Sequence, residues 1–362
     1  MNLLNLTSIN RSELITASVV FIIVLSVVVT SRLTRLTGNE AIEISTNIQL
    51  TFTEISDLDD LEYKLDSLSV SYDSEELRWA ATLLGWRKYQ RGSYHFEGHY
   101  SYNDFLSKMT RGIQDAVEII ILPGITIERY SSVIAEQMHF SRDELLSVFS
   151  DSVFLQEKGL SSQELFGRML PNTYLTYWTR TPKEIINQIL NEFKNKVTEP
   201  YEGRFKELRY DVDQIVTLAS IVEWEAKFTE EKPRISGLYW NRLDRGMRLQ
   251  ADPTVNYALG ERRRLLFEDY EYDHPYNTYV NRGLPPGPIT NPSLNTIEAT
   301  LFPEDHNYLY MVANPEGGHV FTETFSEHQR ESEKWRIWLR EQYRIKRQQE
   351  EALQNSSTSS ED

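Results

Sequence analysis

The chain has 362 residues, of which 40% are hydrophobic and 12% aromatic, and it carries a formal net charge of −16. A chain of this length usually forms about two domains, and its apolar content is sufficient for packed cores, which excludes disorder of the whole chain. The negative charge argues against a nucleic-acid partner, because phosphate binding needs a surplus of Lys and Arg. The absence of cysteine excludes disulfides, thiolate nucleophiles and Cys-ligated zinc.

After a short N-terminal segment of residues 1–13, the chain contains an uncharged apolar run from Leu14 to Thr30. As a helix this run spans about 25 Å, slightly less than the ~30 Å hydrocarbon core of a bilayer. Arg11 and Arg32 flank it and can place their charges among the lipid headgroups. The small-residue cleavage site of a secretory signal does not follow. We predict a single-pass transmembrane anchor, with a cleaved signal and a buried core helix as alternatives; the Lys and Arg distribution hardly determines its orientation.

Residues 41–122 are predicted to form a small α+β unit, entered through a polar linker from Thr34 to Thr46. Apolar spacing and turn residues define its elements. They are a half-buried strand at Asn47–Glu54, helices at Asp57–Leu68 and Ser74–Trp86, a helix capped by Ser101, and a buried strand at Ala116–Leu122 that ends at Pro123-Gly124.

Residues 124–345 are predicted to form a mixed α/β domain, so that the fold class of the chain is α+β. It begins with a helix-rich stretch from Thr126 to Val197 and continues with a segment rich in Gly, Pro, Asn and Tyr. A charged amphipathic helix is expected at Glu327–Ala352, and we interpret its charges as the solvent-facing side, with a protein partner as the alternative. Residues 346–362 form a charged, low-complexity tail that ends in NSSTSSED.

One predicted helix, from Asp213 to Phe228, contains two glutamates with different surroundings. We expect Asp213 to cap it. At about 100° per residue, Glu225 lies about 20° from Leu218 and therefore on the apolar face, whereas Glu223 lies roughly 200° further round, on the more polar side.

A carboxylate on an apolar face is unfavourable unless the protein uses it. Desolvation raises its pKa and keeps a proton available near neutral pH, as a general acid for glycosidic cleavage requires. The alternative is a structural role for Glu225, in which it bonds a backbone group or pairs with an arginine such as Arg242.

Three downstream clusters contain the residue types that bind sugars, in loops that Gly and Pro can hold rigid. Amide and carboxylate side chains bond sugar hydroxyls, and aromatic faces cover sugar C–H surfaces. The candidate binding residues in these clusters are Asn241, Gln250, Asp252, Tyr276, Asn277, Tyr279 and His319. We interpret Tyr239 and Trp240 as core aromatics, and His328 as a surface or capping residue.

Four stretches resemble, in order and separation, the MltG/YceG-like family of endolytic murein transglycosylases. They are LASIVEWEA, LYWNRLDRGMRLQADPTV, YNTYVNRGLPPGPITNPS and LYMVANPEGGHVFTETFSEHQ, between Leu218 and Gln329. A weaker element, LPNTY, has Asn172 where the family usually has Asp. The chain also has Trp224, Ala226 and Gln329 where the family commonly has Lys, Thr and Asn. Before residue 123 the agreement is one of layout: an anchor followed by a small LysM-like unit.

The resemblance implies a bacterial enzyme of the cytoplasmic membrane whose catalytic region lies outside the cytoplasm. Such an enzyme cleaves the MurNAc–GlcNAc β-1,4 bond of nascent peptidoglycan without adding water and leaves 1,6-anhydro-MurNAc ends. Glu225 would act first as acid and then as base, and Glu223 would join the sugar-binding residues. The implied partners are glycan strands and the cytoplasmic membrane, with peptidoglycan synthases as further expected partners. The implied cellular role is the termination of glycan elongation. Neither a cofactor nor a metal ion is expected.

Two other functions stay open from the residues themselves. A non-catalytic scaffold that binds peptidoglycan would use the same sugar-binding residues, without chemistry at Glu225. A wall hydrolase would add water and leave reducing ends, and it would need a second carboxylate near the bond, for which Asp252 is the candidate.

Overall fold

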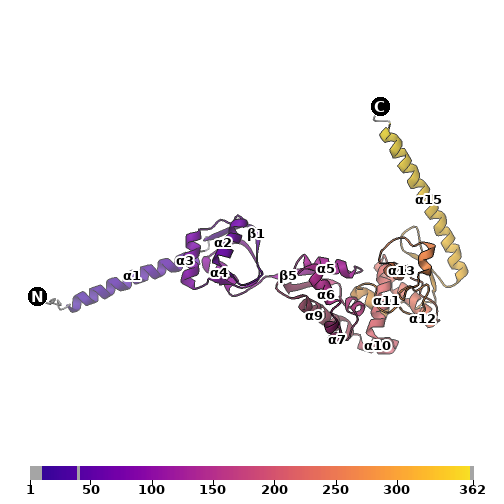
Figure 1. The fold of residues 1–362 in the computed structure, drawn as a ribbon, viewed down its shortest axis with the longest axis horizontal. Helices are drawn as coiled ribbons and strands as arrows, with labels where there is room; N and C mark the ends of the chain where they lie inside the picture. Colours follow the sequence, from indigo (N-terminus) through magenta and orange to yellow (C-terminus); the bar gives the residue numbers. More distant parts are fainter. Residues whose placement is uncertain (1–9, 39–40, 359–362) are drawn as a thin grey trace. The chain divides into compact units, whose positions relative to one another are not determined.

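The computed structural model describes residues 10–38 and 41–358, and the chain divides into two compact units (Figure 1). Unit 1 comprises residues 1–117 and 175–180, and unit 2 comprises residues 118–174 and 181–362. The division falls before the expected boundary near residue 123, and residues 175–180 were expected in the second domain. It cuts through both strands of one pair, β5 (Ala116–Ile121) and β6 (Asn172–Tyr177). The fold is mixed α and β, as predicted.

The N-terminal helix α1 (Arg11–Thr37) is longer than the predicted anchor. Its 27 residues, with a mean hydropathy of 2.6 over an 18-residue stretch, make it long and apolar enough to cross a membrane. At about 1.5 Å per residue it spans about 40 Å, more than the hydrocarbon core. Its last turns belong to unit 1, because Leu36 is buried there and Arg35 pairs with Glu76 and lies 4.1 Å from the ring centre of Trp79. The predicted linker from Thr34 is therefore wrong.

The core of unit 1 is a two-stranded antiparallel sheet covered by helices. β1 (Ile42–Phe52) pairs with β4 (Gly92–Tyr100), with an irregularity between Ile44 and Ile48, and it starts five residues before the predicted strand. The remaining elements are β2 (Ser56–Asp57), α2 (Leu58–Ser67), α3 (Ser74–Leu84), β3 (Lys88–Tyr89) and α4 (Tyr102–Thr110). Ser101 caps α4 by accepting the Asp104 N–H at 3.0 Å, as predicted. Whether this unit is LysM-like stays a prediction.

β5 differs from the expected buried strand. Its residues alternate between exposed and buried, because it pairs with β6 alone and one face of this two-stranded sheet meets solvent. The helix-rich stretch that follows is confirmed. Its helices are α5 (Ile127–Ala135), α6 (Arg142–Val148), α7 (Ser152–Lys158), α8 (Ser162–Gly167), α9 (Pro182–Phe193), with a π-helical turn at Lys194–Thr198, and α10 (Glu202–Leu208).

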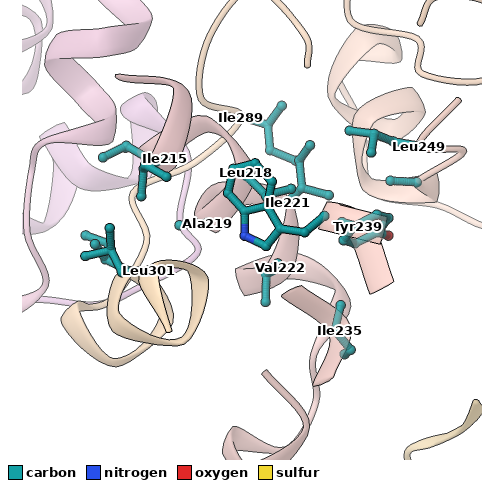
Figure 2. Close-up of a cluster of buried hydrophobic side chains, with 14 of the residues drawn as sticks. Ile215, Leu218, Ala219, Ile221, Val222, Ile235, Tyr239, Leu249, Ile289 and Leu301 are labelled. Atoms are coloured by element: carbon teal, nitrogen blue, oxygen red, sulfur yellow. The ribbon is translucent and has the colours of Figure 1, made fainter. Parts of the chain in front are cut away.

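The centre of unit 2 is α11 (Val212–Glu225), which packs against α12 (Lys232–Asp244), α13 (Asp252–Leu259) and α14 (Leu294–Leu301). All residues from Ile215 to Val222 are buried, so the helix is surrounded on every side and has no polar face. Leu218, Ile221 and Val222 lie among the side chains of the neighbouring elements (Figure 2).

The ends of α11 differ from the prediction. Asp211 is the cap, because its carboxylate accepts the Gln214 N–H at 2.8 Å, whereas Asp213 pairs with Arg168 at 2.7 Å. The helix stops at Glu225 because Ala226 has extended backbone angles. Glu225 is thus the last helical residue and lies at the edge of the core.

A hairpin and a long helix complete unit 2. β7 (Tyr310–Ala313) pairs antiparallel with β8 (His319–Thr322), and α15 (Phe325–Thr358) packs on both. The predicted helix at Glu327–Ala352 is present and longer at both ends. Residues 346–358 of the expected tail are therefore helical, and residues 359–362 lie outside the described residues.

Candidate active site

A cleft of about 540 Å³ opens at the C-terminal end of α11. Its walls come from α11, α12, the start of α13, the β7–β8 hairpin and the first turn of α15. It brings together five residues that the sequence pattern singled out: Glu225, Gln250, Asp252, Tyr279 and His319. It also contains residues that sequence reasoning assigned elsewhere or missed: Tyr239, Arg242, Tyr270, Tyr310 and His328.

Glu225 is a partly buried carboxyl group whose protonation is balanced near neutral pH. Ile221 and Val222, on the preceding turn, are fully buried. Burial raises the pKa of Glu225 to about 7, and the negative charge of Asp252 acts in the same direction. Tyr239 and Arg242 oppose this shift, because both stabilise the ionised carboxylate. The group can therefore both give and take a proton at neutral pH.

Tyr239 has its ring in the core (Figure 2), and its hydroxyl interacts with the carboxyl group of Glu225. The side chain is 1% exposed, and its Oη has no hydrogen bond of ordinary geometry with any described residue. Burial and the nearby Glu225 charge raise the pKa of the phenol. The hydroxyl is thus a neutral donor at the cleft wall, free to meet Glu225 or a bound hydroxyl. The interpretation of Tyr239 as a core aromatic is confirmed for its ring, but it missed the hydroxyl group at the cleft.

Arg242 does not form the ion pair with Glu225 that was one form of the structural alternative. Its Nε donates to the Leu309 carbonyl at 2.6 Å, and its Nη1 donates to the Leu249 carbonyl at 2.5 Å. The guanidinium is buried and fixed by two loops, so its charge acts on Glu225 through space. A fixed cation of this kind stabilises the anion that forms when Glu225 gives up its proton.

Asp252 is held at the first turn of α13 by two phenols. Its Oδ1 accepts the Tyr279 hydroxyl at 2.6 Å, and its Oδ2 accepts the Tyr270 hydroxyl at 3.4 Å. The two rings lie 4.5 Å apart. Burial and the Asp252 charge both raise the pKa of Tyr279, so its proton stays available for this bond.

Gln250 reaches the cleft from an unusual backbone position. Its φ of 50° is left-handed, a conformation that disfavours a non-glycine residue by about 1–2 kcal/mol. The surrounding backbone compensates: Gln250 N–H donates to the Thr278 carbonyl at 3.2 Å, and Ala251 N–H donates to the Thr278 hydroxyl at 3.0 Å. Strain held by neighbours at a cleft is typical of functional positions.

His319 is oriented by a carboxylate that the sequence pattern did not reveal. Glu231 accepts the His319 backbone N–H at 2.8 Å, and its other oxygen lies 3.1 Å from Nδ1. Gly318 has a φ of 102°, and a Cβ there would lie 2.7 Å from Glu231 Oε1, so only glycine lets the chain wrap this carboxylate. Nε2 is the ring nitrogen left for a ligand. Glu231 is 88 residues away, which is why spacing gave no signal.

Glu223 lies outside the cleft lining, in a buried polar cluster. Its carboxylate is 3.1 Å from Lys232 Nζ, accepts the Ser293 N–H at 3.0 Å, and accepts the Thr296 hydroxyl. Burial acts to raise the pKa of Glu223, but these hydrogen bonds and Lys232 outweigh it, so the pKa is lowered overall. Both carboxylate oxygens of Glu223 have partners from α12 and the start of α14. This arrangement favours a structural role for Glu223 over direct contact with sugar.

Three other candidate binding residues also lie outside the cleft lining. Asn241 donates to the His306 and Tyr308 carbonyls at 2.7 and 3.1 Å, and Tyr276 packs on Tyr257 with ring centres 4.6 Å apart. Asn277 is fully buried and accepts the Tyr279 N–H at 2.9 Å. These side chains fix the loops that carry the lining residues.

His328 and Tyr310 form the far wall of the cleft. Their rings stack 5.3 Å apart, and burial together with the Arg242 charge lowers the pKa of His328. The sequence interpretation placed His328 on the surface because the long α15 has a charged pattern, and the contact of its first turn with β7 was not visible. Within residues 10–38 and 41–358, no group of three or more His, Asp or Glu side chains has the arrangement of a metal site.

The residues that depart from the family pattern lie outside the cleft lining. Trp224 faces a separate cavity of about 270 Å³, where its Nε1 donates to the Gly124 carbonyl at 2.9 Å and Arg262 covers its ring at 4.6 Å. Gln329 and Asn172 are exposed. Trp224 and Ala226 are the two chain neighbours of Glu225.

Comparison with known proteins gives a family match and several similar proteins. The YceG-like family matches residues 51–334. The endolytic murein transglycosylase of Bacillus subtilis (strain 168) is 32% identical over 263 residues, which is 68% of this chain and 73% of that protein. The endolytic murein transglycosylase of Streptococcus pneumoniae serotype 2 (strain D39 / NCTC 7466) is 28% identical over 262 residues, and the chain spans about half of its length (47%).

A solved structure agrees with these sequence matches. The crystal structure of a YceG-like protein from Listeria monocytogenes has a TM-score of 0.55 and 27% identity, and the alignment covers 79% of this chain and 99% of that one. The family match contains every cleft residue described above, from Glu225 to His328. The chain belongs to the YceG-like family.

Proposed function

We propose that this chain is a lytic transglycosylase that cleaves the MurNAc–GlcNAc β-1,4 bond of nascent peptidoglycan and leaves 1,6-anhydro-MurNAc ends. The observation that carries the proposal is Glu225, a carboxyl group with a pKa of about 7 in a cleft lined by amide, carboxylate and phenol groups. The names of the relatives, endolytic murein transglycosylases, support the same reaction.

The reaction needs one group that acts twice. Protonated Glu225 gives its proton to the oxygen that leaves muramyl C1, and the C1–O bond breaks with an oxocarbenium-like transition state. The resulting carboxylate then takes the proton of the C6 hydroxyl, and O6 bonds to C1 to close the anhydro ring. No water is added, and Glu225 ends protonated as it began. Arg242 stabilises the carboxylate between the two steps.

The other cleft residues have distinct roles in this proposal. Asp252 places a negative charge near the developing positive charge of the sugar and keeps Glu225 protonated. Gln250 and His319 supply hydrogen bonds to sugar substituents, and the Tyr239 hydroxyl positions the Glu225 carboxyl. Asn241 and Asn277 hold loops that carry lining residues, whereas Glu223 and Tyr276 lie outside the lining and contribute to packing and stability.

The pH dependence of the reaction should report Glu225 and its coupling to Asp252. Only the protonated acid starts the reaction, so kcat/KM should fall about tenfold per pH unit above pH 7. Asp252→Asn removes a charge that raises this pKa, so the alkaline limb should move to lower pH. Glu261→Gln, in an exposed loop outside the cleft, should leave the limb in place. An unchanged limb in Asp252→Asn, measured with purified glycan strands, would contradict the coupling of Glu225 to Asp252.

Two alternative functions make different products from the same strands. A hydrolase that used Asp252 as its second carboxylate would leave reducing ends, and a scaffold would bind strands and leave their ends unchanged. Asp252 lies in the cleft, so a hydrolase stays an alternative to the transglycosylase. The raised pKa of Glu225 favours a catalytic function over binding alone.

We also propose that α1 anchors the chain in a bacterial cytoplasmic membrane and that unit 2 lies outside it, where peptidoglycan is found and where synthases would be partners. A reporter that is active only after export, fused at Asn355, should be active. Activity of a reporter that works only in the cytoplasm, fused at the same position, would contradict this topology.

A further inference from the structure

The second half of α15 contains a segment that the proposed reaction does not use. Residues 335–347, WRIWLREQYRIKR, carry five basic residues and one acidic residue, a net charge of +4 in a chain of −16. We call them the basic aromatic segment. The family match ends at residue 334, so the segment lies just beyond it. It is part of one continuous helix, drawn in yellow in Figure 1.

Four of the five basic residues of the segment lie on the side of the helix opposite most of its apolar residues. Counted at about 100° per residue from Trp335, Trp338, Leu339 and Ile345 all lie within about 80° of it. The two tryptophan rings stack 4.8 Å apart. Ile337, on the other side, is the apolar exception, and the polar exceptions are Gln342 and Lys346, each about 20° from Trp335. The opposite side, from about 100° to 180°, is formed by arginines: Arg336, Arg340, Arg344 and Arg347.

Among the described residues, the segment has no hydrogen-bonding or ionic partner outside α15. The first turn of α15 packs on the hairpin through Phe325 and His328, which contact Tyr310. From residue 333 to residue 350, every hydrogen bond and ion pair of the described side chains stays within the helix, as in Arg340 with Glu333 at 3.1 Å. Such exposed pairs stabilise a helix only slightly. On the apolar side, Ile345 is exposed, whereas Trp335, Trp338 and Leu339 are half-buried.

We infer that the basic aromatic segment binds the surface of an anionic lipid membrane. A helix with tryptophan and leucine on one side and arginine on the other is typical of helices that lie in the interface between headgroups and acyl chains. The arginines would contact lipid phosphates. Helix α1 of the same chain is long and apolar enough to cross a membrane, so the proposed anchor would bring the segment to a lipid surface without a further partner. This second attachment would hold unit 2 at the membrane.

A second copy of the chain fits the segment less well. In a coiled coil the seam would run through Gln342 and Gln349, one and two heptads after Trp335, and these amides weaken a paired core. Two copies side by side would also bring two charges of +4 together, which is unfavourable. A lipid surface of opposite charge removes this repulsion.

The test uses the natural absence of cysteine in the chain. Ile345→Cys provides one site for an environment-sensitive fluorophore on the apolar side, and Arg340→Cys provides the matched site on the opposite side. The full chain is reconstituted through α1 into phosphatidylcholine vesicles, with or without phosphatidylglycerol, containing a lipid-borne quencher. We expect strong quenching at position 345, weak quenching at position 340, and loss of quenching without phosphatidylglycerol or at high salt.

Variants separate the apolar and ionic contributions. Trp335→Ser with Trp338→Ser should abolish quenching at position 345, whereas Ile337→Ser on the other side should not. Arg344→Glu with Arg347→Glu should weaken membrane association by about fivefold for each unit of charge removed. Equal quenching at both sites, no quenching in any vesicle, quenching independent of phosphatidylglycerol, or a signal that depends only on protein concentration would each overturn the inference. The last result would identify a second copy as the occupant.

Discussion

Glu225→Gln should lower the rate of strand cleavage by at least about 10²–10⁴-fold, because one residue serves both proton transfers. The amide keeps the size of the side chain and most of its hydrogen bonds, but it can neither give nor take the proton. The loss should appear mainly in kcat, since sugar binding by Gln250, Asp252 and His319 is unaffected. Steady-state kinetics on purified glycan strands measure it, and binding of strands by the variant serves as the control for an intact cleft.

The same substitution should stabilise the fold at neutral and alkaline pH. The folded pKa of Glu225 is about 7 against an ordinary value of 4.5, so the folded state holds this proton more tightly than the unfolded state. The resulting stability is fully present below pH 4.5 and is lost as pH rises through 7. Glu225→Gln does not titrate, and above pH 7 its free energy of unfolding should exceed that of the wild type by about 1–3 kcal/mol. A melting temperature below wild type would contradict this.

Glu223→Gln should have the opposite profile: a large loss of stability with the chemistry retained. Lys232 is 7% exposed and would be left as a buried charge without its carboxylate, which costs about 3–5 kcal/mol. Folded Glu223→Gln should still cleave strands, because Glu225 and the cleft lining are unchanged. Denaturant unfolding measures the loss.

Two controls show whether the buried pair is the cause. Glu304→Gln breaks the exposed pair with Arg234 and should cost less than about 1 kcal/mol. Glu223→Gln combined with Lys232→Met removes both charges and should recover part of the stability. The pKa of Glu223 is lowered in the fold, so its contribution is present above pH 4.5 and is lost as pH falls through its folded pKa. Wild-type unfolding of Glu223→Gln would contradict this account.

The central helix shows how far sequence reasoning extends. The spacing of Leu218, Ile221 and Val222 predicts α11 and places Glu225 on its apolar side, and burial raises the pKa as expected. The predicted polar side was wrong. Ser220 accepts the Ile289 N–H at 3.0 Å, and Glu223 bonds Ser293 and Thr296, so polar residues about 70 positions apart satisfy one another inside the core. Periodicity along one helix contains no information about such partners.

The cleft shows the same limit. Asp252 and Asn277 have side chains suited to sugar hydroxyls, yet Asp252 lines the cleft and Asn277 is buried and holds the backbone of its own turn. An asparagine side chain uses the same amide donors and acceptor whether it binds a sugar hydroxyl or a backbone carbonyl. The residue type alone therefore does not distinguish a sugar-binding role from a structural one. Tyr239 and His328 were missed for a related reason: each looks apolar or surface-like along its helix, and the contact that defines it comes from another element.

The central claim is tested most directly by mass spectrometry of the glycan products made from purified strands by wild type, Glu225→Gln and Glu223→Gln, with folding checked by thermal melting. Wild type and folded Glu223→Gln should produce 1,6-anhydro-muramyl ends, and Glu225→Gln should produce almost none. Reducing ends from the wild type would indicate hydrolysis, and bound but uncut strands would indicate a scaffold. Full activity of Glu225→Gln beside an inactive, folded Glu223→Gln would show that Glu223 is the catalytic carboxylate.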